Sequence, residues 1–363
     1  MAEQNREEML VYVGTYTGKE DRGEGIYVYR MHPASGALEF ASSVSDIVNP
    51  SFLAIHPQKR RLYAVNEVDD FEDSAGGAVS AFSIDPKTGG LTYLNRQSSQ
   101  GAGPCHLSVD ATGKAVLVAN YSGGSVAALP IRDDGRLGEA TAFIQHRGSS
   151  VNPGRQSGPH AHSITIDPTN RYAFAADLGI DKILIYRLDA DRAAITPNDE
   201  PWTQVHAGAG PRHFAFHPNG KYAYLINELD NTTVAYTYDD AAGTLREVQT
   251  ITTLPEDFSD TSYCADIHVS PSGKFVYGTN RGHDSIVIFR IDGGTGQLTC
   301  VGYESTQGEF PRNFAIDPTG TFLFAANQNT DNIVAFRIDQ QTGALTPTGH
   351  VTHVRAPVCV KII

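Results

Sequence analysis

Arginine, glutamate and histidine side chains occupy equivalent positions in a motif that recurs along the chain. Each copy has a proline, five further residues and then a His-Pro, Asp-Pro or Ser-Pro turn, as in residues 211–218. Counting back five residues from the turn gives one column, and the residue after the next apolar segment gives a second. The two columns contain, among others, His162, Arg212, Glu228, Arg281 and Arg312. Guanidinium groups bind carboxylates and phosphates through paired hydrogen bonds, and Glu or His can accept a proton. The columns therefore predict a site for an anionic ligand.

Further polar residues stand in these columns or directly beside them. They have the hydrogen-bonding groups that hold a polar substrate. We expect substrate-binding roles for six of these residues, namely Arg312, Asn313, His213, Glu67, Tyr16 and Gln328.

The segment 159–163, Pro-His-Ala-His-Ser, is unusual within the repeat. Two histidines two residues apart on an extended strand point the same way, which could suit a metal ion. No third ligand stands at a clear spacing, so we expect no metal and no other cofactor. A histidine titrates near neutrality and suits a general base better than Glu228 beside an arginine. Both His160 and His162 therefore remain candidates.

The segments that must position these residues repeat with a period near 50. Short apolar segments ending in Asn or Asp lie 47 to 57 residues apart, at residues 62–66, 116–120, 172–177, 222–227, 275–280 and 322–327. This period, built only from short strands, is typical of a β-propeller with one four-stranded blade per repeat. We expect the proline-led strand to be innermost and find no convincing amphipathic helix.

The two ends of the chain indicate how the ring closes. The chain starts with a second strand at residues 11–15 and finishes with a lone innermost strand at residues 357–362. We predict an all-β, seven-bladed β-propeller of four-stranded antiparallel blades, closed by pairing of these two strands. Residues 1–363 would form one domain, and closure would remove the exposed sheet edges.

In an antiparallel blade, the first strand starts beside the end of the second, so both columns should meet at one mouth of the ring. Two long loops, residues 145–158 and 67–77, would lie on this face as rims or lids. Arg212 and Arg312 could instead have a structural role, because they share a column and could be struts between blades. The asparagines that end the second strands are expected to cap turns.

Composition excludes several classes of partner. The formal net charge is −13, which makes nucleic acid and an anionic membrane poor partners, and no apolar run reaches 18 residues. Residues 1–8 are polar and do not resemble a signal peptide. The four cysteines include no CxxC pair, so we expect them to be reduced and structural, in a cytoplasmic protein. The blades lack the Trp-Asp signature of WD40 repeats, which disfavours a generic protein-interaction propeller.

The sequence resembles the lactonase-type seven-bladed propellers, which include one kind of 6-phosphogluconolactonase and the fungal carboxy-cis,cis-muconate cyclase. The matching segments span the chain, at residues 13–17, 49–53, 159–163, 177–181, 210–213, 226–228, 279–285 and 311–314. The resemblance implies an active centre of His160 or His162 with Arg212, Glu228 and Arg281, and no metal.

We therefore expect a lactone hydrolase that acts on an anionic sugar lactone. The first choice of substrate is 6-phosphoglucono-1,5-lactone, in the pentose phosphate pathway of carbohydrate metabolism. The arginines would hold the phosphate and stabilise the oxyanion. One alternative is a lactonising enzyme like the muconate cyclase, with the arginines on the carboxylates of a dicarboxylate. The other is a non-enzymatic propeller that binds an anionic ligand.

Overall fold

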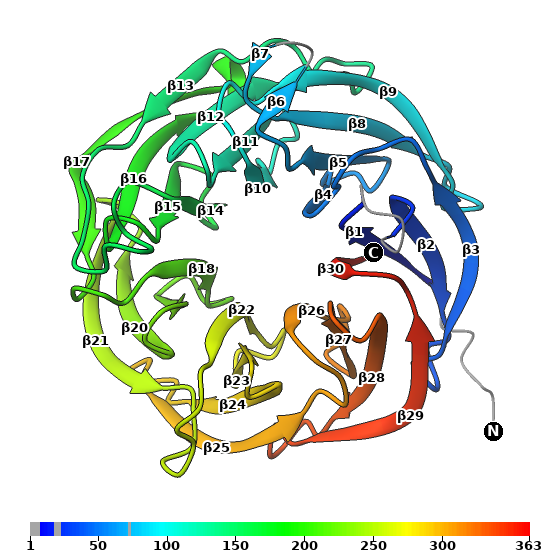
Figure 1. The fold of residues 1–363 in the computed structure, drawn as a ribbon, viewed down its shortest axis with the longest axis vertical. Helices are drawn as coiled ribbons and strands as arrows, with labels where there is room; N and C mark the ends of the chain where they lie inside the picture. The colour runs from blue at the N-terminus through cyan, green and yellow to red at the C-terminus, as the bar shows by residue number, and fades with distance from the viewer. Residues whose placement is uncertain (1–7, 18–22, 72–73) are drawn as a thin grey trace.

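Short antiparallel strands form nearly all of the regular structure. The computed structural model describes residues 8–17, 23–71 and 74–363. The polar start of the chain therefore lies mostly outside the described residues, as do two residues of the loop 67–77. Within the described part, the strands form seven four-stranded sheets arranged as a ring around an axis (Figure 1). A two-stranded hairpin of β6 (Asp70–Phe71) and β7 (Ser74–Ala75) and a 3-10 turn at Ala190–Arg192 stand outside the blades.

Each blade contributes one strand to each of four concentric positions. The innermost strands are β30 (Pro357–Ile362), β4 (Leu53–Ile55), β10 (Pro104–Val109), β14 (Ala161–Ile166), β18 (Pro211–Phe216), β22 (Tyr263–Val269) and β26 (Pro311–Ile316). Their neighbours are β1 (Met9–Thr15), β5 (Arg61–Asn66), β11 (Ala115–Asn120), β15 (Tyr172–Asp177), β19 (Tyr222–Asn227), β23 (Phe275–Arg281) and β27 (Phe322–Asn327). The third strands are β2 (Ile26–Met31), β8 (Ala78–Ile84), β12 (Ser125–Pro130), β16 (Lys182–Asp189), β20 (Thr232–Asp239), β24 (Ser285–Ile291) and β28 (Asn332–Ile338). The outer strands are β3 (Leu38–Val44), β9 (Leu91–Ser98), β13 (Ala142–Gln145), β17 (Ala194–Gln204), β21 (Thr244–Thr252), β25 (Leu298–Ser305) and β29 (Leu345–His353).

The ring closes as the sequence predicts. The last strand, β30, pairs antiparallel with β1, with Val13 opposite Val360 and Val11 opposite Ile362. One blade therefore contains both ends of the ordered ring, and the order of its strands is β30-β1-β2-β3. The prediction of a seven-bladed, all-β propeller closed in this way is confirmed.

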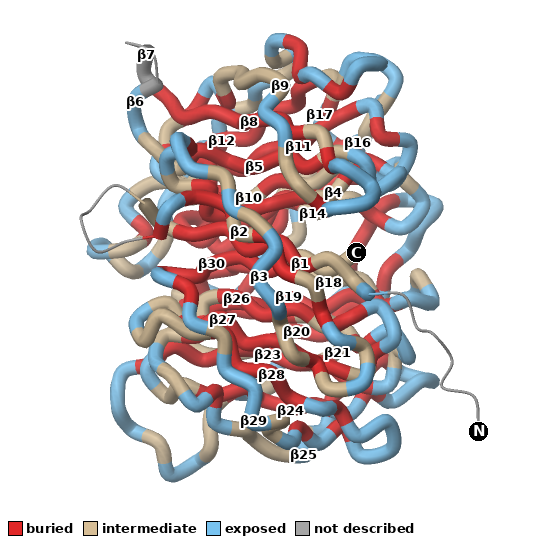
Figure 2. Tube along the Cα trace, turned by 90° about the vertical axis from the view of Figure 1, so that its right-hand side faces the viewer, coloured by how far each residue is buried: buried red, intermediate tan, exposed pale blue. Residues whose placement is uncertain are grey.

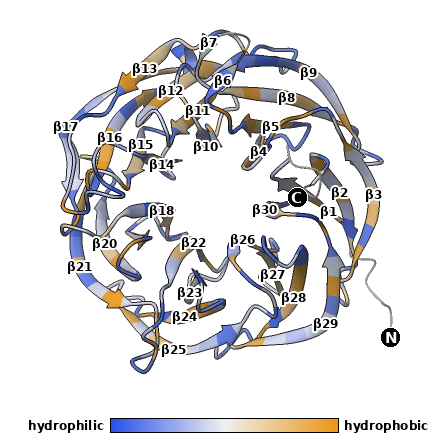
Figure 3. Ribbon diagram, viewed as in Figure 1, coloured by the Kyte–Doolittle hydropathy of each residue, from blue (hydrophilic) through white to orange (hydrophobic). Residues whose placement is uncertain are grey.

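The second strands are buried on both faces because each blade packs against the next. In β15 and β19 every residue is buried, and Phe174 of β15 stacks on Phe214 of the neighbouring inner strand with ring centroids 5.6 Å apart. Buried residues run along the strands in stacked rows, and exposed residues gather in the loops (Figure 2). The outer strands alternate between hydrophilic and hydrophobic stretches, as expected for strands that face solvent on one side (Figure 3).

The asparagines that end the second strands tie each blade to the segment that enters it. The Nδ2 atoms of Asn120, Asn280 and Asn327 donate to the carbonyl oxygens of Ser99, Thr253 and Thr306, respectively. Each acceptor directly follows an outer strand, so the bond fixes where the chain crosses inward. These side chains satisfy backbone groups of buried turns, and their expected capping role is confirmed.

The innermost strands share an irregularity that the sequence did not predict. Five of them skip one residue in their pairing with the second strand, so each has a β-bulge at its start. A bulge leaves the extra residue out of the ladder and re-aims its side chain. The bulged residues, all members of the first column, are Cys105, His162, Arg212, Arg312 and Val358.

Candidate active site

A cavity of about 340 Å³ lies at the mouth of the ring where the inner strands begin. It is lined by Glu67, Cys105, Tyr121, Arg155, His162, Glu228, Tyr263, Arg281, Phe310 and Arg312. The bulges direct Cys105, His162 and Arg312 into it from three blades. The ends of second strands supply Arg281, the last residue of β23, and Glu228, the residue after β19. Both sequence columns therefore converge on this cavity.

Glu228 is the centre of the charge network. Its Oε1 accepts a hydrogen bond from Nη2 of Arg155 at 2.6 Å. Its Oε2 accepts from Nε of Arg212 at 3.0 Å and lies 2.9 Å from Nη2 of Arg281. Three guanidinium groups thus surround one carboxylate that is only 5% exposed. This arrangement fixes the three cations relative to one another.

The cluster shifts the protonation equilibria of its own members. Burial alone would raise the pKa of Glu228, but Arg281, Arg212 and Arg155 outweigh it and lower that pKa to about 2. Burial, together with Arg281 and Arg312, lowers the pKa of Arg212 to about 10. At neutral pH Glu228 is therefore an anion and Arg212 a cation, and neither is poised to exchange a proton.

Backbone carbonyl groups hold the arginines from behind. Arg281 donates from Nη2 to the carbonyl oxygen of Cys264 at 2.8 Å and from Nε to that of Tyr263 at 3.3 Å. Arg212, which is 1% exposed, also donates from Nη1 to the carbonyl oxygen of Ala265. Arg212 therefore lies beneath the cavity and positions Glu228. Its bond to the next blade also fits the predicted strut.

His162 lies beside this network with its imidazole in the neutral form. Its Nε2 is 3.8 Å from Oε2 of Glu228, and its Nδ1 is 3.9 Å from Sγ of Cys105. Burial, then Arg212, His213 and Arg312, lower the pKa of His162 well below its ordinary value. The expectation that this histidine titrates near neutrality is therefore wrong, because three cationic or imidazole neighbours oppose a second charge.

A second carboxylate faces the cavity from the opposite side. The hydroxyl of Tyr16 donates to Oε1 and Oε2 of Glu67 at 3.1 and 3.0 Å, and Ser51 Oγ donates to Oε2. The guanidinium of Arg312 lies over the Tyr16 ring, 5.3 Å from its centroid. In the described part of the chain, Arg312 has no hydrogen-bond or ion-pair partner within contact distance. Its N–H groups are therefore available to a ligand.

The charge of the cavity is opposite in sign to that of the whole chain. Counting Arg212 beneath it, four guanidinium groups, from Arg155, Arg212, Arg281 and Arg312, face the two carboxylates of Glu67 and Glu228 among the described residues. This leaves an excess of two positive charges in a protein of formal net charge −13. Such a site attracts an anion.

The two histidines of segment 159–163 occupy different environments. The expectation that both lie on one strand and point the same way is wrong, because β14 begins at Ala161 and bulges at His162. His160 precedes the strand, stacks on the Tyr121 ring at 4.6 Å and contacts the Tyr121 carbonyl oxygen through Nδ1 at 3.0 Å. Of the pair, His162 lines the cavity and His160 supports its Tyr121 wall. The described residues contain no group of three metal-ligating side chains.

Three other candidates lie away from the cavity. Asn313 donates to Asp266 and accepts from the Val360 amide at 2.7 Å, so its amide is used within the core. His213 bonds Oδ1 of Asp266 through Nδ1 at 2.7 Å and lies one step further along the channel. Gln328 is half-buried, and its Nε2 donates to Oδ1 of Asn329 at 3.5 Å. None of the three lines the cavity, whereas Tyr16 borders it through Glu67 and Arg312.

Arg155 is the main residue that the repeat did not reveal. It lies in the loop 145–158, which has no counterpart in other blades. Gln156 anchors the loop by donating to the Leu178 carbonyl oxygen at 2.9 Å and to Oδ1 of Asp181 at 2.8 Å. The loop is thus a rim, as expected, and its arginine reaches Glu228. Tyr121 and Cys105 stood in the sequence columns but carried no charge to single them out.

Comparison with known proteins assigns the family. The model of the family described as "Lactonase, 7-bladed beta-propeller" matches residues 10–362. The chain belongs to this family of seven-bladed propeller lactonases.

Relatives named for a lactonase activity cover most of the chain. It is 40% identical to a 6-phosphogluconolactonase of Bacillus subtilis over 84% of this chain and 83% of the relative. It is 39% identical to a 6-phosphogluconolactonase of Formosa agariphila over 84% and 86% of the two chains. The structure of a periplasmic gluconolactonase from Pseudomonas aeruginosa superposes with a TM-score of 0.91 at 34% identity, covering 98% and 99% of the two chains.

Proposed function

We propose that the protein hydrolyses an anionic sugar lactone, 6-phosphoglucono-1,5-lactone, to the open-chain acid. The observation that carries this proposal is the excess of guanidinium groups over carboxylates in a 340 Å³ cavity. Two relatives with about 40% identity are named for this activity, which supports the choice of substrate.

The arginines bind different groups of the substrate. Arg312, whose N–H groups are available, binds the phosphate, because paired charge-assisted hydrogen bonds suit that group. Arg155 and Arg281 are held by Glu228 and donate to the carbonyl oxygen of the lactone as it becomes an oxyanion. Their positions are fixed before the reaction, which is the condition for electrostatic stabilisation of a transition state.

His162 accepts the proton of the attacking water. Its neutral Nε2 is unprotonated when Nδ1 carries the hydrogen, and Glu228, 3.8 Å away, stabilises the imidazolium that forms. The water oxygen bonds to the carbonyl carbon, the ring C–O bond breaks, and the proton returns from His162 to the departing alkoxide. The acid product then ionises and releases one proton.

Glu67 favours a polyhydroxylated substrate over a dicarboxylate. Its carboxylate is held by the hydroxyls of Tyr16 and Ser51 and can accept hydrogen bonds from sugar hydroxyls, but it repels a second carboxylate. This observation places lactone hydrolysis ahead of muconate-type cyclisation.

The deciding experiment compares three substrates on purified protein, with acid release followed in a pH-stat. We expect turnover of 6-phosphogluconolactone well above its spontaneous hydrolysis, weaker turnover of unphosphorylated gluconolactone, and none of a muconolactone. Rates equal to spontaneous hydrolysis for both sugar lactones would reject the proposal.

We also propose a cytoplasmic location. All four cysteines are free thiols, which fits a reducing compartment, and the described residues include no helix long and apolar enough to cross a membrane. Cell fractionation tests this location directly, since the Pseudomonas aeruginosa relative is described as periplasmic.

A further inference from the structure

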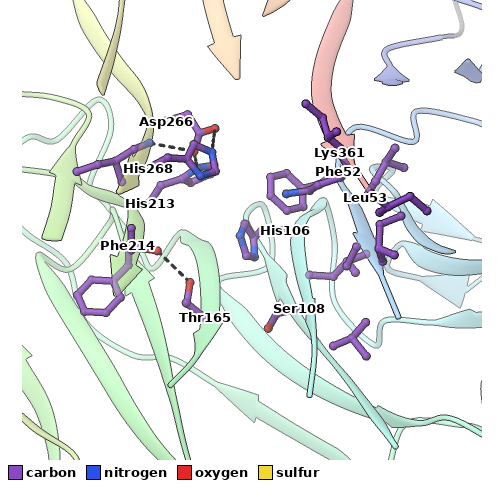
Figure 4. A pocket seen from close by; sticks show the side chains of 18 residues that line it. Phe52, Leu53, His106, Ser108, Thr165, His213, Phe214, Asp266, His268 and Lys361 are labelled. Atoms are coloured by element: carbon purple, nitrogen blue, oxygen red, sulfur yellow. Dashed lines mark hydrogen bonds and ion pairs between the residues drawn. The ribbon is translucent and has the colours of Figure 1, made fainter. Parts of the chain in front are cut away.

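The central channel contains a second cavity, of about 450 Å³, further along the inner strands (Figure 4). Six inner strands line it, including β10, β18 and β30, and the proposed reaction uses no residue within it. Phe52 and His213 border both this cavity and the narrow passage beneath His162. The two cavities are thus neighbours along one axis, with different linings.

The walls of the second cavity are mainly apolar, with one cationic group. Leu53, Leu107 and Ile267 are among the aliphatic residues that line it. The Lys361 side chain points into the cavity, and its Nζ lies 4.4 Å from the centroid of the Phe52 ring (Figure 4). Among the described residues, Lys361 has no hydrogen-bond or ion-pair partner. A cation beside apolar walls gains most from an anionic partner.

The carboxylate in this cavity does not serve as that partner. Asp266 accepts from Nδ1 of His213 at 2.7 Å, from Nε2 of His268 at 2.9 Å, and from Asn313. It also accepts from the Ile267 amide at 3.0 Å. Both oxygens are therefore occupied by donors, and Lys361 is left to an external ligand.

Hydrogen bonds also fix which nitrogen carries the proton in the imidazoles of His106 and His213. The Ile164 amide donates to Nδ1 of His106 at 3.3 Å, so the proton of the neutral His106 ring is on Nε2. His213 donates from Nδ1 to Asp266, so its Nε2 is an acceptor. The His106 and His213 rings lie 5.4 Å apart. The cavity thus offers an ammonium group, an N–H donor and an imidazole acceptor.

We propose that this second cavity binds a small organic carboxylate with an apolar body and a hydroxyl group. Lys361 and the Nε2–H of His106 bind the carboxylate, Nε2 of His213 accepts from the hydroxyl, and the aliphatic walls hold the body. The apolar walls disfavour a sugar phosphate, so the ligand differs in class from the substrate of the arginine-rich cavity.

Isothermal titration with 3-phenyllactate tests the proposal. We expect saturable 1:1 binding, weakened at least tenfold by Lys361→Met and at least tenfold when 3-phenylpropanol, which lacks the carboxylate, replaces the probe. Lys182→Met is the matched control, because Lys182 also lies 4.4 Å from an aromatic ring, that of Trp202, but on the outer part of a blade. It should bind as the wild type does.

A variant of the other cavity separates the two sites. Arg312→Met should leave phenyllactate binding unchanged. Absence of saturable binding, equal affinity for phenylpropanol, or loss of binding in Arg312→Met with retention in Lys361→Met would each overturn the proposal. Should Lys361→Met fail to fold, the comparison of acid and alcohol on the wild type decides. This test measures no lactone turnover, so its outcome is independent of the proposed function.

Discussion

At the scale of single residues, the site depends on one carboxylate that organises three cations. Glu228 binds Arg155, Arg212 and Arg281, and without it these three guanidinium groups would repel one another. Glu228 therefore matters to stability as well as to turnover.

Glu228→Gln should lower kcat by about 100-fold, because Glu228 holds Arg155 and Arg281 towards the developing oxyanion and stabilises the imidazolium of His162. It should also lower the free energy of unfolding by about 3 kcal/mol, because it leaves buried cations unpaired. Steady-state kinetics and urea unfolding measure the two effects. Glu247→Gln, at an exposed position, should change neither. Wild-type kcat in Glu228→Gln would exclude Glu228 from the reaction.

Arg312→Met should raise KM for the phosphorylated lactone by roughly 30- to 100-fold, equivalent to about 2–3 kcal/mol of charge-assisted hydrogen bonding. It should leave KM for unphosphorylated gluconolactone nearly unchanged, since Arg312 is assigned to the phosphate. Arg290 also lies 5.3 Å from an aromatic ring, that of Phe275, so Arg290→Met is the control. A similar increase in KM for both lactones would remove the phosphate assignment.

The pH dependence of kcat should have no inflection near pH 6.5. His162 must be neutral to accept a proton, and its pKa lies well below 6.5, so the rate should stay level from pH 6 to 8 and fall only at lower pH. Rates corrected for spontaneous hydrolysis test this expectation. A half-maximal rate near pH 6.5 would point to a histidine in a more polar setting than His162.

At the scale of elements, the inner strands combine regular pairing with a bulge at the point of function. The repeat predicted where the inner strands start and which side chains share a column, because apolar periodicity and turn prolines are local signals. The bulges themselves carry no such signal, yet they turn His162 and Arg312 into the cavity. The repeat positions in the sequence therefore indicated where the site lies. The bulges in the strand pairing determine which side chains enter the cavity.

Two parts of the site lay beyond sequence reasoning for physical reasons. Arg155 belongs to a loop outside the repeat, and the bonds of Gln156 that place it join residues more than 20 positions apart. Asn313 and His213, which directly follow members of the first column, were expected at the mouth. The bulge shifts Asn313 and His213 one step down the channel, where Asp266 binds both.

Removal of β30 should affect the whole ring. Deletion of residues 357–363 removes the strand that pairs with β1 and leaves the ring open. The inner edge of β1 is then exposed. We expect loss of most cooperative stability and a tendency to aggregate, measured by thermal unfolding and size-exclusion chromatography. A truncated protein that melts at the wild-type temperature would contradict the importance of this closure.

At the scale of the whole molecule, buried imidazoles make stability depend on pH. Burial is the first cause that lowers the pKa of His106, His162 and His213, the last to about 4. The unfolded chain binds these protons near pH 6.5 and the folded chain does not, so stability should fall as pH drops below 6.5. Each histidine contributes a slope of at most about 1.4 kcal/mol per pH unit in this window.

A second window lies at lower pH. The folded pKa of Glu228 is depressed to about 2, so its stabilising contribution is present above its ordinary value of 4.5 and is lost as pH falls towards 2. Urea unfolding between pH 4 and 8 should show the histidine window first. Constant stability between pH 7 and 5 would mean that these imidazoles are solvated when folded.

The pairing of β1 with β30 also has a consequence for biosynthesis. The two strands are separated by almost the full chain, since β1 begins at Met9 and β30 at Pro357. At ribosomal rates of 5–20 residues per second, β1 waits roughly 20–70 s before its partner is made. Throughout that interval β1 can pair with β2, but its other edge, which β30 covers in the finished ring, stays exposed. The ring therefore cannot close before residues 357–362 have been made, and β1 is where a chaperone would be expected to bind in the meantime.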